Sequence, residues 1–586
     1  MGRTHFRPWL NRGVLAVSLL ALGACGGGDG KSGGSASLFG FGPSDNIPAL
    51  PTTTHPTTQE AGRFLTQATF GPTDDSITSL TGSTYDDWIT AQFASPETLH
   101  LADIDARYQY KHAKDPNAYI NENDFYDGFW QQAVTGDDQL RQRVALALSE
   151  IFVTSFTNPN VDARGMADYY DVLSRDAFGN FRDLLQDVTL HPMMGIYLNA
   201  LGNEKEDPTT GRHPDENYAR EVMQLMTIGL YQLNTDGTKK LDLLGQPIPS
   251  YEQADVKGLA KVLTGWSWYS PSPDDGTFYG WPRDNDASVH AMIAYNDFHS
   301  TAEKDFLGTT IPASNVPDAK ADLKVALDTL FNHPNVGPFI SKQLIQRLVT
   351  SNPSPDYVRR VATVFNNNGS GVRGDMKAVV RAILTDTEAR GSAGLTSPTF
   401  GKLREPVVRM AHVLRAFKAT SHTGQWLMDS TSDSLKQSPL DAGSVFNFWR
   451  PGYVPPNTTL GDNGYVAPEF QGVNEISVSS YVNTMQYALS NGLGEWFNAY
   501  YGQDIQFGLA DEANKHAGDP AYLADHMNLV FLNGQMSAGL RAHIITAVSA
   551  IDIVNGSPND NAQNRLNRVR TAILLTVASP EYIAQR

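Results

Sequence analysis

The sequence predicts a mainly α-helical protein, built as one large multi-helix domain with a small β-hairpin and two long irregular loops. Apolar residues recur at steps of three and four along most of the chain after residue 140, which is the spacing of one face of an α-helix. Strand-like alternation is confined to one short region. Hydrophobic residues make up 41% of the chain and aromatic residues 10%, so it can fold around a core rather than stay disordered.

The chain begins with the pattern of a secretion signal. Three arginines precede an apolar stretch at residues 13–21, which is too short to cross a membrane. The stretch ends in Leu22-Gly23-Ala24-Cys25, which resembles a bacterial lipobox, the motif whose cysteine is lipidated and becomes the mature N-terminus. We expect residues 1–24 to be a signal peptide and Cys25 to be the lipidation site. The alternative is an incidental cysteine beside an ordinary cleavage site.

Residues 25–59 predict a flexible tether. Glycine and serine follow the cysteine, and proline and threonine dominate the second half of the segment. Such compositions give flexible or semi-extended chain rather than a packed fold. We expect residues 60–586 to form a single large domain, with a candidate sub-boundary near 390–440.

Charge and cysteine content exclude several classes of function. The net charge is −18, and the first 24 residues contain three arginines and no acid, so the chain without them is more negative still. This excess argues against nucleic acid as a partner. Cys25 is the only cysteine, so the predicted domain has no disulfide, thiolate metal site or cysteine nucleophile.

The helical prediction rests on a series of amphipathic or wholly apolar segments. Residues 140–153 are apolar nearly all round, which is typical of a buried helix. The other predicted helices lie at about 164–177, 215–230, 253–265, 318–331, 337–349, 355–366, 373–386, 401–417, 475–490, 539–551 and 563–578.

One hairpin and two irregular segments interrupt the helices. Residues 230–233 and 240–244 alternate around an Asp236-Gly237 turn, which predicts a hairpin. Residues 266–312 and 438–475 are rich in glycine, proline and aromatic residues. Loops of this length inside a domain are usually functional or wrap its surface.

The densest group of candidate functional residues follows His213. Pro214 and two acids make a good helix start, and the next residues place polar side chains in one arc of the helix, with apolar ones opposite. The candidate catalytic residues are Glu216, Glu221, Arg220 and Asn217, and the candidate ligand-binding residues beside them are His213 and Gln224. In the functional interpretation the glutamates act as acid or base and Arg220 binds an anion. In the structural one, the same residues cap the helix and pair with neighbouring helices.

Two charges interrupt the apolar 140–153 helix. Arg143 and Glu150 lie two turns apart on one stripe, too far to pair with each other. A buried charge needs a partner, and we expect a structural ion network that reaches Glu221 or Arg220. In the enzyme hypothesis, Glu150 is a further acid/base candidate.

The 266–299 loop carries a second set of candidate ligand-binding residues. Its aromatic and imidazole rings could stack on sugar rings, or they could pack beneath the loop as a satellite core. The candidates are Trp266, Trp268, Tyr269, Trp281 and His299.

Motifs for metals, cofactors and activated nucleophiles are missing from the sequence. The histidines are scattered, without the His-Glu-x-x-His spacing of a zinc helix. Neither a Gly-x-Ser-x-Gly elbow nor a phosphate-binding P-loop occurs. We therefore expect no metal and no cofactor.

Several blocks together resemble a family of large secreted bacterial proteins, the domain of unknown function 1800 (DUF1800). The matching blocks are Ala61–Pro72, Leu140–Phe152, His213–Gly229, Asp255–Trp266, Ser444–Tyr453, Val466–Gln471 and Ser579–Tyr582. The resemblance implies one mostly helical, exported domain over about residues 60–586. It carries no established catalytic residues, so none is transferred.

Two functions follow as hypotheses. The first is a membrane-anchored extracytoplasmic lipoprotein that acts as a hydrolase or lyase on an envelope or environmental polymer through carboxylates. The alternative is a non-catalytic surface lipoprotein that binds glycan or a partner protein. Gly26 follows the cysteine where Asp would favour inner-membrane retention, so the outer membrane is favoured as the location of the anchor.

Overall fold

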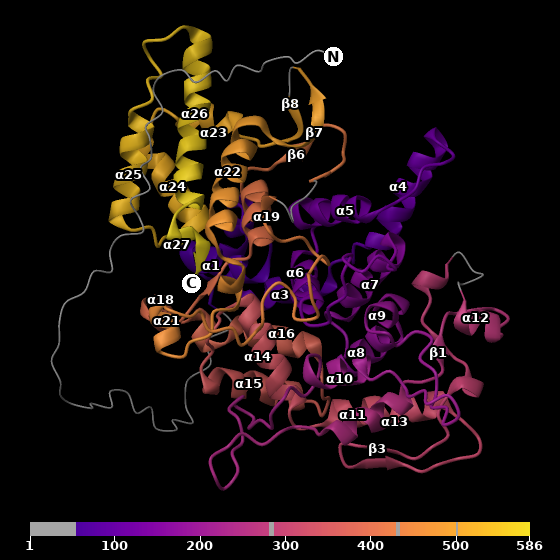
Figure 1. Ribbon diagram of the computed structural model, residues 1–586. Helices are drawn as coiled ribbons and strands as arrows, with labels where there is room; N and C mark the ends of the chain where they lie inside the picture. The colour runs from indigo at the N-terminus through magenta and orange to yellow at the C-terminus, as the bar shows by residue number, and fades with distance from the viewer. Residues whose placement is uncertain (1–53, 281–285, 429–433, 500–501) are drawn as a thin grey trace. The chain divides into compact units, whose positions relative to one another are not determined.

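The computed structural model describes residues 54–280, 286–428, 434–499 and 502–586, and these are mainly helical (Figure 1). The predicted fold class is thereby confirmed. The predicted signal peptide, Cys25, most of the tether and Trp281 lie outside the described residues. None of the helices in the described part is both long and apolar enough to cross a membrane.

Nine helices precede the first candidate site in the described chain. They are α1 (Thr58–Ala68), α2 (Asp74–Thr81), α3 (Tyr85–Ala94), α4 (His100–Lys114), α5 (Glu122–Thr135), α6 (Gln139–Ser149), α7 (Ala163–Asp176), α8 (Phe181–Leu190) and α9 (Pro192–Tyr197). A capping box between Thr57 and Glu60 starts α1, because each side chain satisfies a free backbone N–H of the first turn. Every residue of α6 is buried, as its all-round apolar pattern predicts.

The middle of the chain contributes the helices from α10 to α19. They are α10 (Asn217–Gln224), α11 (Gln253–Val262), α12 (Asp275–Tyr279), η1 (Ala287–Val289), η2 (Asn296–Phe298), α13 (Ala319–Asn332), α14 (Val336–Leu348), α15 (Pro355–Asn366), α16 (Met376–Thr385), α17 (Thr387–Arg390), α18 (Ala393–Thr396) and α19 (Pro406–Ala416). The helix predicted at 401–417 begins later, because residues 402–403 pair as a strand and Pro406 takes the first helical turn. The helix predicted at 215–230 is limited to α10, and turns follow it.

The C-terminal part adds a helical group. It comprises α21 (Thr459–Asp462), η3 (Pro468–Gly472), α22 (Glu475–Asn491), α23 (Ala510–His516), α24 (Pro520–Leu532), α25 (Ala538–Ser549), α26 (Pro558–Val577) and α27 (Pro580–Ile583). Helices α24, α25 and α26 lie side by side (Figure 1).

Strands are short and antiparallel. They are β1 (Trp266–Ser267) with β2 (Ile293–Ala294), β3 (Lys304–Phe306) with β4 (Thr309–Ile311), β5 (Lys402–Leu403) with β9 (Ala584–Gln585), and β8 (Gly502–Gln506) between β6 (Thr420–Ser421) and β7 (Leu493–Asn498). The predicted hairpin forms with a single bridge, Leu233 opposite Lys239, rather than as strands. Tyr231 lies opposite Pro249 and Leu241 opposite Pro247, so the segment after the predicted hairpin also pairs with it. The segment predicted as an irregular loop at 266–312 contains β1 to β4.

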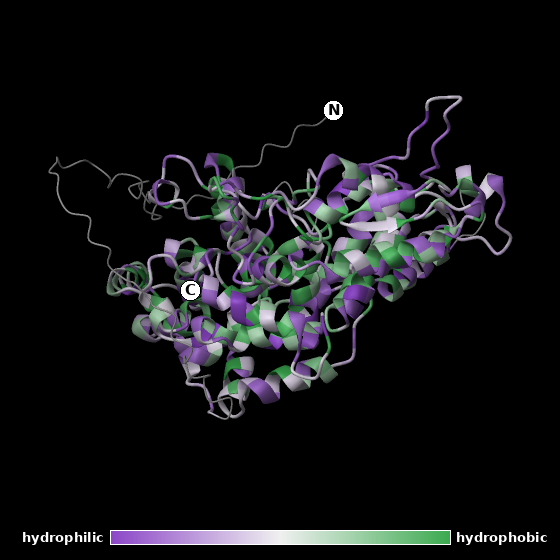
Figure 2. Ribbon diagram, turned by 90° about the horizontal axis from the view of Figure 1, so that it is seen from below, coloured by the Kyte–Doolittle hydropathy of each residue, from purple (hydrophilic) through white to green (hydrophobic). Residues whose placement is uncertain are grey.

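Buried side chains from α1 to α27 join in one hydrophobic core, and Ala49–Arg586 forms one compact unit. Most helices carry both hydrophobic and hydrophilic residues, as amphipathic helices around a core do (Figure 2). Packing is close where α11 crosses β3. A Cβ atom on Gly258 would lie 1.8 Å from the carbonyl oxygen of Asp305, so this crossing requires glycine.

Candidate functional site

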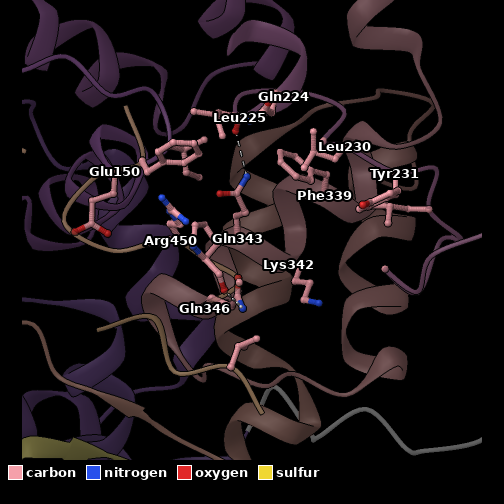
Figure 3. Close-up of a pocket in the computed structure, with 18 of the residues that line it drawn as sticks. Glu150, Gln224, Leu225, Leu230, Tyr231, Phe339, Lys342, Gln343, Gln346 and Arg450 are labelled. Atoms are coloured by element: carbon pink, nitrogen blue, oxygen red, sulfur yellow. Dashed lines mark hydrogen bonds between the residues drawn. The ribbon is translucent and has the colours of Figure 1, made fainter. Parts of the chain in front are cut away.

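A cavity of about 380 Å³ lies where α14 faces the end of α10, the 229–239 hairpin and the 445–452 loop. Much of its wall is apolar, and Leu225, Leu230 and Phe339 are among the lining residues. Figure 3 shows Glu150 at one edge of this cavity and Tyr231 at the opposite edge. A concave, mainly apolar pocket with a few polar groups is the usual form of a small-molecule site.

Helix α14 supplies one wall of the cavity. Phe339, Lys342, Gln343, Gln346 and Arg347 line it, at the three- and four-residue steps that share one helix face. The amide of Gln343 donates to the carbonyl of Leu225 at 3.4 Å. The amide of Gln346 donates to the carbonyl of Pro451 at 3.3 Å. These two amides therefore connect α14 to the walls on either side of it.

The hairpin wall is held by Asn335, directly before α14. Its Oδ1 accepts from the backbone N–H of Leu233 at 2.9 Å. Its Nδ2 donates to the carbonyls of Ile228 and Tyr231 at 2.7 and 2.8 Å. Asn335 is 1% exposed, so these bonds are shielded from water.

Gly229 lets the chain turn at the base of this wall. Its φ is +71°, and a Cβ atom there would lie 2.7 Å from the ring of Phe339. Both the backbone conformation and the close approach require glycine.

Behind the cavity lies a network of buried charges that begins at Glu150. The Glu150 side chain is buried, lines the cavity, and has its Oε2 3.4 Å from Nε of Arg347. Arg347 also donates through Nη2 to the Glu150 carbonyl at 2.7 Å. Apart from a side-chain hydrogen bond that it shares with the carboxyl of Glu405, the carboxyl of Glu150 accepts no hydrogen bond from the described residues. Two buried carboxyls held this close together are a candidate functional pair.

The network continues away from the cavity through Lys402 and Glu405. Lys402 Nζ lies 3.1 Å from Glu405 Oε1 and 3.0 Å from Glu469 Oε1. Arg143 Nη2 lies 3.8 Å from Glu405 Oε1. Lys402 and Arg143 each donate to the carbonyl of Arg347 at 2.7 Å.

The carboxyls of Glu150 and Glu405 are in contact, and their pKa values are shifted in opposite directions. Burial and the neighbouring Glu405 carboxylate raise the pKa of Glu150 well above its usual value, which favours its neutral form. Burial opposes ionisation of Glu405 too, but Lys402 and Arg143 lower its pKa to about 2. Of the two carboxyls, Glu150, which is among the residues that line the cavity, is therefore the harder to ionise.

The predicted ion network around Arg143 and Glu150 exists, but the expected partners were wrong. Their partners are Glu405 and Arg347 rather than Glu221 or Arg220. Arg347 could have been noticed in the sequence, because it is a charge inside the apolar stretch 344–349, just as Arg143 is at 140–153.

The candidate residues of α10 divide between solvent, the core and the cavity. Glu216 accepts from Arg220 at 3.0 Å and from Gln253 at 2.7 Å at the surface, and Asn217 lies beside them, half-buried. Glu221 is buried, and burial raises its pKa. Gln224 lines the 380 Å³ cavity and accepts from the Tyr251 hydroxyl at 3.0 Å.

The aromatic candidates lie mainly under their loop. Trp266 and Trp268 are buried, and half-buried Tyr269 packs on the ring of His290. His299 is buried, with Nδ1 2.8 Å from the Thr264 carbonyl and Nε2 3.0 Å from Asp322 Oδ2.

His213 and Trp268 come together in a second cavity of about 540 Å³. Exposed Tyr279 also lines it, with Asn203 and Glu204 among the polar groups. No cluster of histidines, cysteines or carboxylates within the described residues has the arrangement of a metal site.

Comparison with known proteins identifies the family to which the chain belongs. A model of the family described as "Protein of unknown function (DUF1800)" matches residues 63–584. No curated protein and no solved structure matches the chain.

Proposed function

The chain belongs to the DUF1800 family, whose function is unknown, and we propose that it is a hydrolase or lyase with Glu150 as its proton donor. The observation that carries this proposal is the buried carboxyl of Glu150, beside Glu405 and with a raised pKa, at the wall of the 380 Å³ cavity. Active sites are where burial and like charges push the pKa values of two carboxyls apart. A substrate in the cavity would lie beside Glu150, whose carboxyl oxygens are themselves shielded from water.

In hydrolysis, the Glu150 carboxyl gives its proton to the leaving oxygen as the bond to that oxygen breaks. Water adds to the atom left behind, and the proton it loses returns to Glu150, which restores the starting state. Arg347 stabilises the Glu150 carboxylate between the two steps, because its Nε lies 3.4 Å from Oε2. In a lyase reaction, the returning proton comes from a carbon atom of the substrate instead of from water.

The substrate proposed is an envelope or environmental polymer, of which one end or side group enters the cavity. The protein would act at the cell envelope, anchored by lipid at Cys25, with the outer membrane favoured. Support for this location comes from the arginine-rich start, the short apolar stretch and the Leu22-Gly23-Ala24-Cys25 ending.

The test is turnover of a panel of esters, polysaccharides and peptidoglycan by the wild type and by Glu150→Gln. Loss of general acid catalysis lowers kcat about 10²- to 10⁴-fold. Glu221→Gln is the matched control, because Glu221 is also a buried glutamate with a raised pKa but does not line the cavity. Equal turnover by Glu150→Gln and the wild type would remove Glu150 from the mechanism.

A second candidate function is glycan binding without catalysis at the 540 Å³ cavity. The observation in its favour is the meeting there of aromatic rings, Trp268 and exposed Tyr279, with His213 and amide and carboxylate groups. In affinity electrophoresis, polysaccharide in the gel should then retard the migration of Tyr279→Ala less than that of the wild type. Tyr110→Ala, at an exposed tyrosine elsewhere, is the control.

A further inference from the structure

The 380 Å³ cavity has the opposite charge balance to the rest of the chain. The sequence carries −18 overall. Yet, among the described residues that line this cavity, four carry a cationic side chain, Lys239, Lys342, Arg347 and Arg450, and Glu150 is the one acid. Such a reversal, in a protein with an excess of acids, points to the charge of a ligand.

Three of these cations have no carboxylate partner among the described residues. Lys239 Nζ lies 4.4 Å from the centre of the Tyr231 ring, and the Arg450 guanidinium lies 4.9 Å from that of Phe446. Lys342 is half-buried and forms no ion pair or hydrogen bond within the described parts of the chain. Burial and Lys239 lower the pKa of Lys342, so an anion between the two amines would relieve their repulsion.

The rest of the wall selects for more than charge. Leu225, Leu230, Phe339, Val445 and Val466 line the same cavity. Water forms few hydrogen bonds with such a surface. An apolar group that displaces this water gains about 25 cal/mol of binding free energy per Å² of buried apolar area.

We propose that this cavity binds an amphiphilic anion: an apolar acyl chain or ring that carries a carboxylate or phosphate, held by Lys342, Lys239 and Arg450. The inference rests on the cavity being the site of the proposed function and names the chemistry of the group that enters it. The apolar part lies against Phe339 and the leucines. The acidic head lies toward the cations, where each charge-assisted hydrogen bond strengthens binding.

The experiment measures binding of three probes by calorimetry to purified full-length protein. The probes are octanoate, octyl phosphate and the uncharged octan-1-ol, which share the chain and differ in the head. We expect at least one acid to bind about tenfold more tightly than the alcohol, which corresponds to about 1.4 kcal/mol. The two acids separate a carboxylate preference from a phosphate preference.

Two variants locate the binding. Lys342→Gln and Arg450→Gln should each weaken binding of the preferred acid about fivefold or more, and leave octan-1-ol binding unchanged. Lys320→Gln, at an exposed lysine of α13, is the matched control and should change neither. Added salt should weaken binding of the acid alone.

Three results overturn the inference: no binding of any probe, equal affinity for acid and alcohol, or acid binding that is insensitive to Lys342→Gln and Arg450→Gln. The proposed function fails separately. If the acids bind as expected but Glu150→Gln keeps full turnover, the cavity binds anions and Glu150 is not the acid. If Glu150→Gln abolishes turnover but acids bind no better than the alcohol, only the anion inference is lost.

Discussion

Glu150 and Arg347 are 197 residues apart in the chain, yet one guanidinium binds both the main chain and the side chain of that glutamate. Arg347 donates to the Glu150 carbonyl at 2.7 Å and lies 3.4 Å from the Glu150 carboxyl. This contact joins the end of α6 to α14, the helix that lines the cavity. Arg347 thus holds the proposed proton donor, Glu150, in position, and both residues line the same cavity.

The buried charges predict a small effect of one substitution and a large effect of another on the free energy of unfolding. Glu150→Gln replaces a carboxyl whose raised pKa favours the neutral form by a neutral amide of the same size, so we expect a change within about 1 kcal/mol. Lys402→Met leaves the buried Glu405 and Glu469 carboxylates without their cation and should cost about 3–5 kcal/mol. Urea denaturation at pH 7 measures both. A large loss in Glu150→Gln would show that the native residue is ionised.

A histidine between two carboxylates predicts how stability changes with pH. Burial alone would lower the pKa of His526, but hydrogen bonds to Asp74 and Glu512 raise it to about 10, from 6.5 for the ordinary group. A raised pKa gives stability that is fully present below pH 6.5 and is lost as the pH rises toward 10.

We therefore expect His526→Gln to destabilise the protein clearly at pH 6 and much less at pH 10. The control is His516→Gln, at a histidine that stacks on the ring of Tyr522. Urea denaturation at several pH values gives the comparison. A destabilisation by His526→Gln that stays constant from pH 6 to pH 10 would contradict the charge argument.

The hairpin wall of the cavity depends on one amide. Asn335→Ala leaves the backbone groups of Leu233, Ile228 and Tyr231 without their partner, and we expect a loss of about 1–3 kcal/mol in stability. Binding of the preferred acid probe should weaken with it, because Lys239 is carried on that wall. Asn332→Ala, at an exposed position, should change neither quantity. If Asn335→Ala keeps wild-type stability, these bonds do not hold the wall.

The proposed anchoring of the protein to a membrane can be tested by substitution of Cys25, the predicted lipidation site. In a bacterial host, we expect the wild type to be recovered with membranes and Cys25→Ser to be recovered without them. Several acyl chains on one cysteine hold a protein on a bilayer firmly, whereas their loss leaves no anchor. Fractionation of both forms, with detergent release as a check, decides this. The same distribution for both would mean that Cys25 is not the anchor.

Local patterns in the sequence were enough to predict the fold class and a helix at each of the twelve predicted ranges, but they missed α1 to α5, α8, α9 and α24. The helix predicted at 355–366 agrees with α15, and that at 318–331 differs from α13 by one residue at each end. Apolar periodicity and helix caps act within a few residues, so they can be read without the fold. The helix predicted at 401–417 was partly wrong because β5 depends on pairing with β9, at the other end of the domain.

The candidate site was also predictable only in part, because it too depends on contacts between residues far apart in the chain. The sequence by itself determined that Arg143 and Glu150 are buried charges in need of partners, and that α10 has a polar face. Only the tertiary structure decided that Glu150 meets Glu405 and Arg347, and that the polar face of α10 is divided between solvent, core and cavity. Ion pairs and cavities arise from helix packing across hundreds of residues, and local periodicity carries no information about which helices meet.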